Sequence, residues 1–100
     1  MATKKLPPIH PGEILGDALN ESGLSANCAA LAMRIPANRL TMILNGKRSI
    51  TAETALRLAR YFGTSPAVWM NLQTKYDVDV ASDADGDRIA AEVAPLKRAS

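Results

Sequence analysis

The residues best suited to chemistry in this chain lie between Pro36 and Arg48, and they are hydrogen-bonding and basic in type. Asn38 offers a paired donor and acceptor that match the edge of adenine in the major groove of DNA. Arg39 can bind guanine or a phosphate, and Thr41 can hydrogen-bond or place its methyl group against thymine. These residue types predict a surface that contacts DNA.

Such side chains need a short, exposed helix to carry them, and the sequence predicts one. Pro36 favours the first turn of a helix, and Gly46 favours its end. Apolar residues between them recur at the i, i+3, i+4 spacing of a buried face, namely Leu40, Ile43 and Leu44. The opposite face would point at DNA and carries Ala37, Asn38, Thr41, Met42 and Asn45, with Arg39 at its edge.

A second short helix is predicted before this one, because Ser25 is a good N-cap and small residues follow it. Two helices of about eight to ten residues joined by a three-residue turn are the length signature of a helix-turn-helix, here residues 25–45. The start of the first helix would touch phosphates through Ser25, with Asn27 beside it. Lys47 and Arg48 follow the second helix and would bind the DNA backbone.

Start and stop residues predict three more helices, so that residues 9–76 form five short helices. We therefore expect an all-α fold, with a DNA-binding domain over residues 1–78. The fifth helix would carry Trp69 and Tyr76, which we expect to be shared between the core and a dimer or partner contact. Arg57 and Arg60 are expected to be solvated on the outer face of the fourth helix. His10, the single histidine, is expected to cap a helix or lie on the surface.

The C-terminal part differs in charge. Residues 1–76 contain nine Lys and Arg against four Asp and Glu, whereas residues 77–100 contain three against six. We expect residues 79–100 to be an acidic extension, with room for an extended piece at 78–80 and one short helix at 88–93. Asp83, Asp85, Gly86 and Glu92 match four positions of a calcium-binding loop. Ala81 and Arg88 break that pattern, so a solvated turn is the better interpretation.

The length, the cysteine content and the absence of certain sequence patterns argue against several classes of protein. One hundred residues predict a single domain, and the lone Cys28 excludes an intrachain disulfide and a four-cysteine zinc site. We expect no metal or cofactor. No stretch reaches the roughly 20 apolar residues of a membrane span, and no signal-peptide pattern is present, so we expect a cytoplasmic protein without membrane contact. No nucleophile–base pair or phosphate-binding glycine loop is present, so we expect no enzyme.

Four longer stretches of the sequence match a known protein family. These stretches are "IHPGEIL" at 9–15, "PANRL" at 36–40, the run from 44 to 78, and "VAPLK" near the end. Through them the chain resembles the HigA/VapI class of bacterial antitoxins, within the Xre/Cro-like (lambda repressor-like) helix-turn-helix family. The resemblance implies a five-helix fold with a C-terminal extension and a homodimer on a palindromic DNA operator. It also implies repression of its own operon and neutralisation of a cognate HigB-type toxin that cleaves mRNA.

The chain departs from the family pattern at several positions, among them Arg34, Ala26 and Ala37. Arg34 stands in the turn where glycine is usual, so we expect either a reshaped turn or a strained residue. Ala26 stands where glutamine often contacts bases, and Ala37 has no hydrogen-bonding side chain. Two alternatives stay open, and these departures favour the second of them. One is a stand-alone Xre-family transcriptional regulator without a toxin, and the other is a protein-interaction module that has lost DNA binding.

Overall fold

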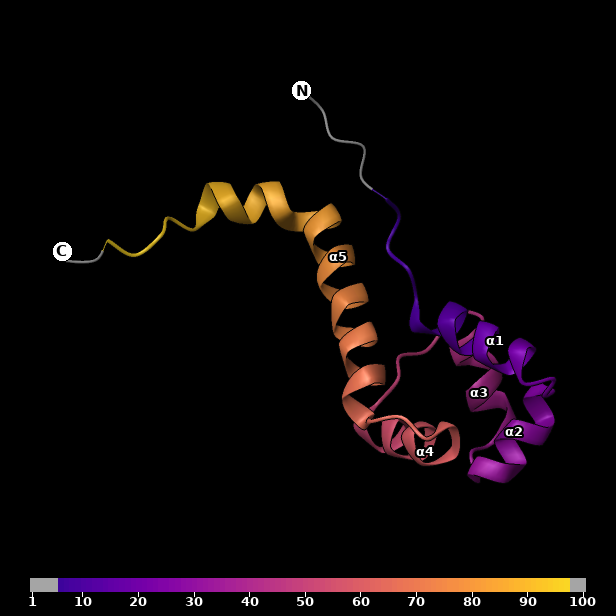
Figure 1. Cartoon of the computed structure of the whole chain (residues 1–100). Helices are drawn as coiled ribbons and strands as arrows, with labels where there is room; N and C mark the ends of the chain where they lie inside the picture. The colour runs from indigo at the N-terminus through magenta and orange to yellow at the C-terminus, as the bar shows by residue number, and fades with distance from the viewer. Residues whose placement is uncertain (1–5, 98–100) are drawn as a thin grey trace.

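The computed structural model describes residues 6–97, and these residues form five helices. They are α1 (Pro11–Glu21), α2 (Ala26–Met33), α3 (Ala37–Leu44), α4 (Ala52–Phe62) and α5 (Pro66–Glu92), and the described part contains no strand (Figure 1). The predicted all-α, five-helix fold is confirmed. No helix in this part is both long and apolar enough to cross a membrane.

One apolar core joins the first four helices to the first half of α5. Side chains from α1, α3, the following loop and α4 are fully buried in it, among them Leu15, Leu40, Ile43, Ile50 and Leu58. Burying each such side chain contributes about 1.5–3 kcal/mol. The core therefore holds α3 by its inner face and leaves its outer face open.

The helices begin where the cap residues predict. The Nδ1 atom of His10 accepts a hydrogen bond from the Gly12 N–H at 2.9 Å. The Glu13 carboxylate accepts one from the His10 N–H at 3.3 Å, which completes a capping box. The predicted capping role of His10 is confirmed. Side-chain caps also start α2, α4 and α5, at Ser25, Thr51 and Ser65.

The first four helices end in a common motif. A residue with positive φ follows each helix, and the next N–H bonds to the carbonyl five residues earlier, as from Leu24 to Leu19 and from Thr64 to Ala59. Glycine takes the positive φ after α1, α3 and α4, but Arg34 takes it after α2, with φ of 57°. The turn therefore keeps its shape, and Arg34 is the strained residue.

The C-terminal part corrects one expectation. α5 continues to Glu92, so the extended piece at 78–80 and the solvated turn near Gly86 were wrong. Ion pairs along the helix contribute to the continuation, at 3.0 Å between Lys75 and Asp79 and at 3.1 Å between Arg88 and Glu92. Each such pair stabilises a helix by about 0.2–0.5 kcal/mol. The predicted domain boundary at residue 78 falls inside α5.

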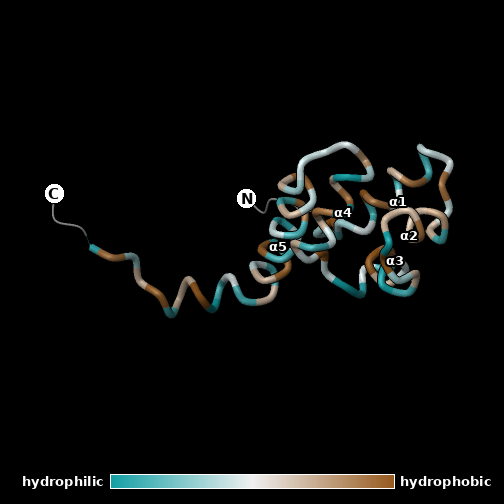
Figure 2. The backbone as a smooth tube through the Cα atoms, turned by 90° about the horizontal axis from the view of Figure 1, so that it is seen from below, coloured by the Kyte–Doolittle hydropathy of each residue, from teal (hydrophilic) through white to brown (hydrophobic). Residues whose placement is uncertain are grey.

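The last part of the described chain leaves the globule. We call residues 84–97 the arm. Figure 1 shows it turning away from the other helices, which contributes to a longest dimension of 55 Å for the described residues. Figure 2 shows hydrophobic and hydrophilic residues alternating along it. Its side chains at Ile89, Val93 and Leu96 are exposed.

Candidate nucleic-acid interface

α2 and α3 form the predicted helix-turn-helix. Each helix has eight residues, and three residues, Arg34 to Pro36, connect them. The middle residue, Ile35, is buried, and its N–H donates to the Ala30 carbonyl at 2.9 Å. Because the turn is anchored both by this bond and by burial of Ile35, the two helices hold a defined crossing. The predicted helix lengths and turn length are confirmed, although the turn begins at Arg34, one residue later than the predicted start at Met33.

The outer face of α3 is open to solvent. The polar and apolar residues predicted to point at DNA are all exposed, namely Ala37, Asn38, Thr41, Met42 and Asn45. The Thr41 hydroxyl donates to the Ala37 carbonyl at 2.9 Å, so its oxygen is left to accept a hydrogen bond. Asn38 is exposed in the first turn of α3, where a helix end can reach base edges.

Arg39 lies differently from these residues. Its side chain is 31% exposed, and its Nη1 atom is 3.5 Å from Oε1 of Glu53 in the first turn of α4. The guanidinium is therefore turned toward the junction of α3 and α4. This agrees with the predicted place of Arg39 at the edge of the face, but the acidic partner was not predicted.

Arg57 corrects a second expectation. It is half-buried rather than solvated, and its Nη1 atom donates to the Met33 carbonyl at 3.1 Å. Its Nε atom is 3.4 Å from Oε1 of Glu53. The reason is that the last carbonyls of α2 lack helical partners and lie within reach of α4. Arg60 is exposed, as expected.

The loop after α3 carries Lys47 and Arg48, and both are exposed. Gln73 of α5 holds this loop from inside, although it was not singled out from the sequence. Its Oε1 atom accepts from the Ile50 N–H at 2.8 Å, and its Nε2 atom donates to Ser49 Oγ at 3.3 Å. Gln73 is only 3% exposed. The only sequence signal for this role was that Gln73, a polar residue, lies between the aromatic residues Trp69 and Tyr76.

A second contact supports the start of the same loop. The ring of His10 lies against Gly46, where an added Cβ would be 3.7 Å from the ring. Tyr76 of α5 also contacts His10, with ring centroids 4.8 Å apart in an edge-on arrangement. α1, the loop and α5 are thus packed together behind the exposed basic pair.

The start of α2 is also accessible. Ser25 and Asn27 are exposed, and Ser25 Oγ accepts from the Cys28 N–H at 3.1 Å. No acidic residue occupies the first turn of α2. An exposed helix start without an acid favours a phosphate, because its free N–H groups and dipole are positive.

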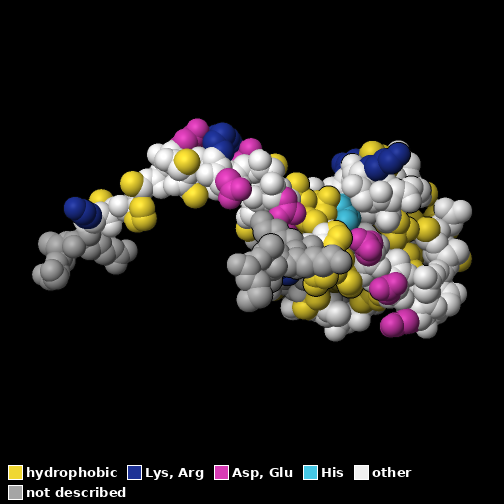
Figure 3. All heavy atoms as spheres, turned by 90° about the horizontal axis from the view of Figure 1, so that it is seen from above, with side chains coloured by type: hydrophobic (Ala, Val, Ile, Leu, Met, Phe, Trp, Pro, Cys, Tyr) yellow, Lys and Arg dark blue, Asp and Glu magenta, His cyan; other side chains and the backbone are white. Residues whose placement is uncertain are grey.

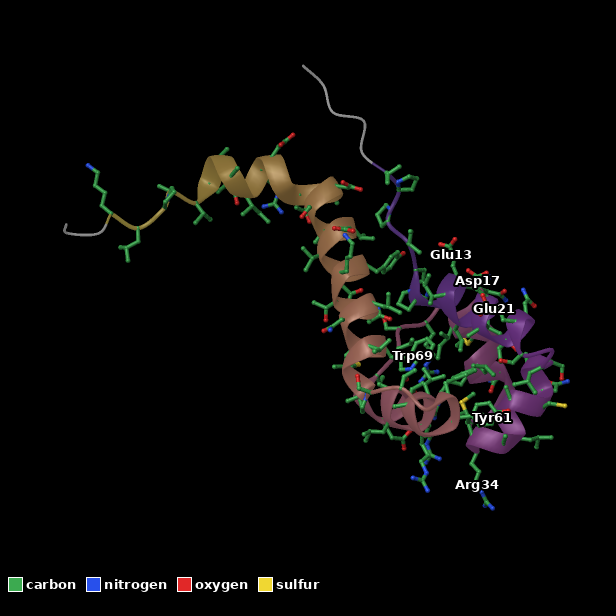
Figure 4. The ribbon with its side chains drawn as sticks, in the orientation of Figure 1. Glu13, Asp17, Glu21, Arg34, Tyr61 and Trp69 are labelled. Atoms are coloured by element: carbon green, nitrogen blue, oxygen red, sulfur yellow. The ribbon has the colours of Figure 1, made fainter. Side chains whose placement is uncertain are left out.

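Trp69 does not reach the surface. Its side chain is 3% exposed, and its Nε1 atom donates to Thr64 Oγ1 at 2.9 Å. Figure 4 shows it between α5 and the body of the globule. This burial leaves the ring no free face for the predicted partner contact. Tyr76 is half-buried against His10 and keeps some exposed surface.

Charge separates the two sides of the globule. No Asp or Glu occurs between Glu21 and Glu53, a span that contains α2, α3 and the basic loop. The acids of α1, Glu13, Asp17 and Glu21, lie along the outer side of that helix (Figure 4). Figure 3 shows acidic atoms along α5 and on one side of the globule, with basic atoms gathered at another margin. The helix-turn-helix side therefore attracts polyanions.

The acidic part of α5 has no metal-binding geometry. Asp83, Asp85 and Glu92 lie in one continuous helix rather than in a loop. Arg88 is paired with Asp85 at 3.2 Å and with Glu92 at 3.1 Å. Within residues 6–97 no group of three or more His, Cys, Asp or Glu could hold a metal ion.

Comparisons with known proteins agree with this geometry. A family model described as helix-turn-helix matches residues 15–69. Virulence-associated protein I of Dichelobacter nodosus is 47% identical over 78 residues, which are 77% of this chain and 72% of that protein. A HigA-family addiction module antidote protein from Coxiella burnetii has a TM-score of 0.88 at 53% identity, covering 91% of this chain and 100% of that chain.

A third relative was solved with DNA. It is the antitoxin HigA of Pseudomonas aeruginosa with the higBA promoter, and it has a TM-score of 0.87 at 44% identity. The match covers 90% of this chain and 99% of that chain.

Proposed function

The chain belongs to the HigA-type antitoxins of the helix-turn-helix family, and from this membership we propose that it is a DNA-binding antitoxin that represses its own operon. The observation that carries the proposal is the open outer face of α3, flanked by Lys47 and Arg48 and free of acids from residue 22 to residue 52. A relative that is 44% identical was solved with its promoter, which supports the same role.

The exposed residues divide by chemistry into two kinds of contact. α3 enters the major groove, where Asn38 binds adenine and Thr41 and Met42 contact neighbouring bases. Ala37 and Asn45 lie at the two ends of the contact. The DNA backbone is held by Ser25, Asn27, Lys47 and Arg48, and each phosphate that a cation neutralises steepens the salt dependence by about 0.9 log units.

The operator is a palindrome bound by a homodimer, with the two copies of α3 about 34 Å apart. The arm supports self-association, because Ile89 is 46% exposed, Val93 63% and Leu96 85%. Apolar side chains along an arm that leaves the globule are stabilised when a second copy covers them.

The toxin-binding role rests on the family and on charge. The cognate partner is an mRNA-cleaving HigB-type toxin with a basic surface, and the acidic residues from Asp77 to Asp87 offer it a complementary charge. The role is non-enzymatic, and the protein acts in the cytoplasm.

A titration of labelled DNA from upstream of its own reading frame tests the proposal. Wild-type protein is compared with Arg39→Ala and with Lys47→Ala/Arg48→Ala. We expect both variants to bind more weakly and the double variant to show a shallower salt dependence. If the wild-type protein does not bind this DNA at low salt, the chain is a protein-interaction module instead. Co-purification with the product of the adjacent gene separates an antitoxin from a stand-alone regulator.

A further inference from the structure

Glu53 is the one acidic residue between Glu21 and Asp77, and it lies beside the proposed DNA-binding helix. Its Oε1 atom is 3.5 Å from Nη1 of Arg39 and 3.4 Å from Nε of Arg57. A single carboxylate oxygen thus bridges two guanidinium groups, one from α3 and one from α4. An acid at this place is unfavourable for DNA binding in general, because it repels phosphates.

Arg57 anchors one end of the bridge. It is half-buried, and its Nη1 atom donates at 3.1 Å to the Met33 carbonyl, at the end of α2. Arg57 thus ties Glu53 to the helix-turn-helix itself. The chain of contacts runs from Met33 through Arg57 and Glu53 to Arg39, and it links α2, α4 and α3. Arg39 is the last member of this chain and the one nearest the DNA-binding face.

The bridge restricts the orientation of the Arg39 guanidinium but leaves some of its N–H donors available to DNA. A guanidinium has five N–H donors in a planar fork, and the contact with Glu53 involves its Nη1 atom. The other donors remain for DNA. A free arginine reaches any nearby phosphate, whereas an arginine held by a carboxylate offers its donors in one direction only.

We propose that Glu53 is a positioning residue that holds Arg39 in the orientation used at the operator and reduces its attraction to other DNA. Glu53 would then set the specificity of binding more than its strength. The inference rests on the proposed DNA-binding function and adds to it a residue that does not itself touch DNA.

The test compares wild type with Glu53→Gln, which keeps the shape of the side chain and removes its charge. Affinities are measured by fluorescence anisotropy for the upstream DNA and for a random duplex over a range of salt concentrations. We expect the ratio of the two affinities to fall about fivefold, a loss within the range of one specific base contact. We expect the salt dependence for random DNA to steepen by up to about 0.9 log units, the equivalent of one more phosphate contact.

Two controls separate this role from a general one. Glu21→Gln removes the same charge from the exposed end of α1, and we expect it to leave the affinity ratio unchanged. In an Arg39→Ala background, Glu53→Gln has no further effect on the ratio if Glu53 acts through Arg39. A ratio that falls equally in both backgrounds assigns Glu53 a structural role and overturns the inference.

The results of these experiments also test the role of Glu53 separately from the proposed DNA-binding function. If wild type prefers the upstream DNA and Glu53→Gln prefers it equally, the inference is wrong and the proposed function stands. If wild type shows no preference, both are wrong. Should Glu53→Gln fail to fold by circular dichroism, Glu53→Asp decides, because its shorter side chain keeps the charge but draws the carboxylate back from Arg39. That variant must then lose part of its preference for the upstream DNA, and an unchanged preference overturns the inference.

Discussion

Gln73 on α5 accepts a hydrogen bond from the Ile50 N–H at 2.8 Å, across 23 residues of chain. Its amide nitrogen donates to Ser49 Oγ at 3.3 Å and to Asp77 Oδ1 at 2.9 Å. A buried side chain of the last helix therefore satisfies the backbone of the loop that carries Lys47 and Arg48. Through this contact, α5 determines the shape of a surface that it does not itself form.

The first prediction concerns this contact. Gln73→Leu leaves the buried Ile50 N–H without an acceptor, which costs about 1–3 kcal/mol of unfolding free energy. Urea unfolding measures the loss. Thr74→Ala is the matched control, since Thr74 is the next residue of α5 and is exposed, and we expect it to stay within about 0.5 kcal/mol of wild type. A Gln73→Leu variant as stable as that control would contradict the role of the amide.

The second prediction concerns the left-handed residue of the helix-turn-helix. Arg34→Gly removes the steric strain at φ of 57° and should raise the unfolding free energy by about 1 kcal/mol. Arg34→Ala keeps a Cβ at the same backbone conformation, so it should remain within about 0.5 kcal/mol of wild type. The two variants are compared by thermal and urea unfolding. Equal effects of glycine and alanine would mean that the side chain, not the backbone, matters there.

The third prediction uses two glycines of α1. A Cβ at Gly12 would collide with the Ile43 carbonyl oxygen near the end of α3, whereas a Cβ at Gly16 would be 3.9 Å from Leu44 Cδ2, an ordinary contact. Gly12→Ala should therefore destabilise the protein by about 1–3 kcal/mol. Gly16→Ala should stabilise it by about 0.5–1 kcal/mol, because alanine favours a helix interior. Urea unfolding of the pair checks the sign of each change, and opposite signs are required.

The fourth prediction concerns the arm. Ile89→Asp and Val93→Asp place charges on the apolar positions proposed to be covered by a second copy, so each should shift the protein toward monomer in sedimentation velocity experiments. The same substitution at Leu56, which is exposed on α4, is the control and should leave the mass unchanged. A dimer that survives both arm substitutions would place the interface elsewhere.

Local features of the fold were predictable from the sequence. The caps at His10, Ser25 and Thr51 depend on residues within five positions of each other, and so do the helix ends at Gly23 and Gly63. The exposed face of α3 followed from the spacing of its apolar residues. Signals of this range need no knowledge of the tertiary structure.

Contacts between distant segments were not predictable in this way. Arg57 binds Met33 across 24 residues, and Gln73 binds Ile50 across 23. Glu53, four residues before Arg57, indicates a local ion pair, but nothing near Arg57 in the chain indicates its bond to the Met33 carbonyl. The length of α5 was missed for another reason. Valine and aspartate have weak helix propensities, while the ion pairs that compensate for them, such as Lys75 with Asp79, act only once the helix exists.

The most direct test of DNA recognition by α3 is the affinity of Asn38→Ala for upstream and random DNA, measured beside wild type and an Asn20→Ala control on α1. Loss of a bidentate base contact costs about 1–3 kcal/mol, so we expect weaker binding to the upstream DNA by about fivefold or more. Binding to random DNA and the behaviour of Asn20→Ala should not change. Equal affinity of wild type and Asn38→Ala for the upstream DNA would contradict base recognition by α3.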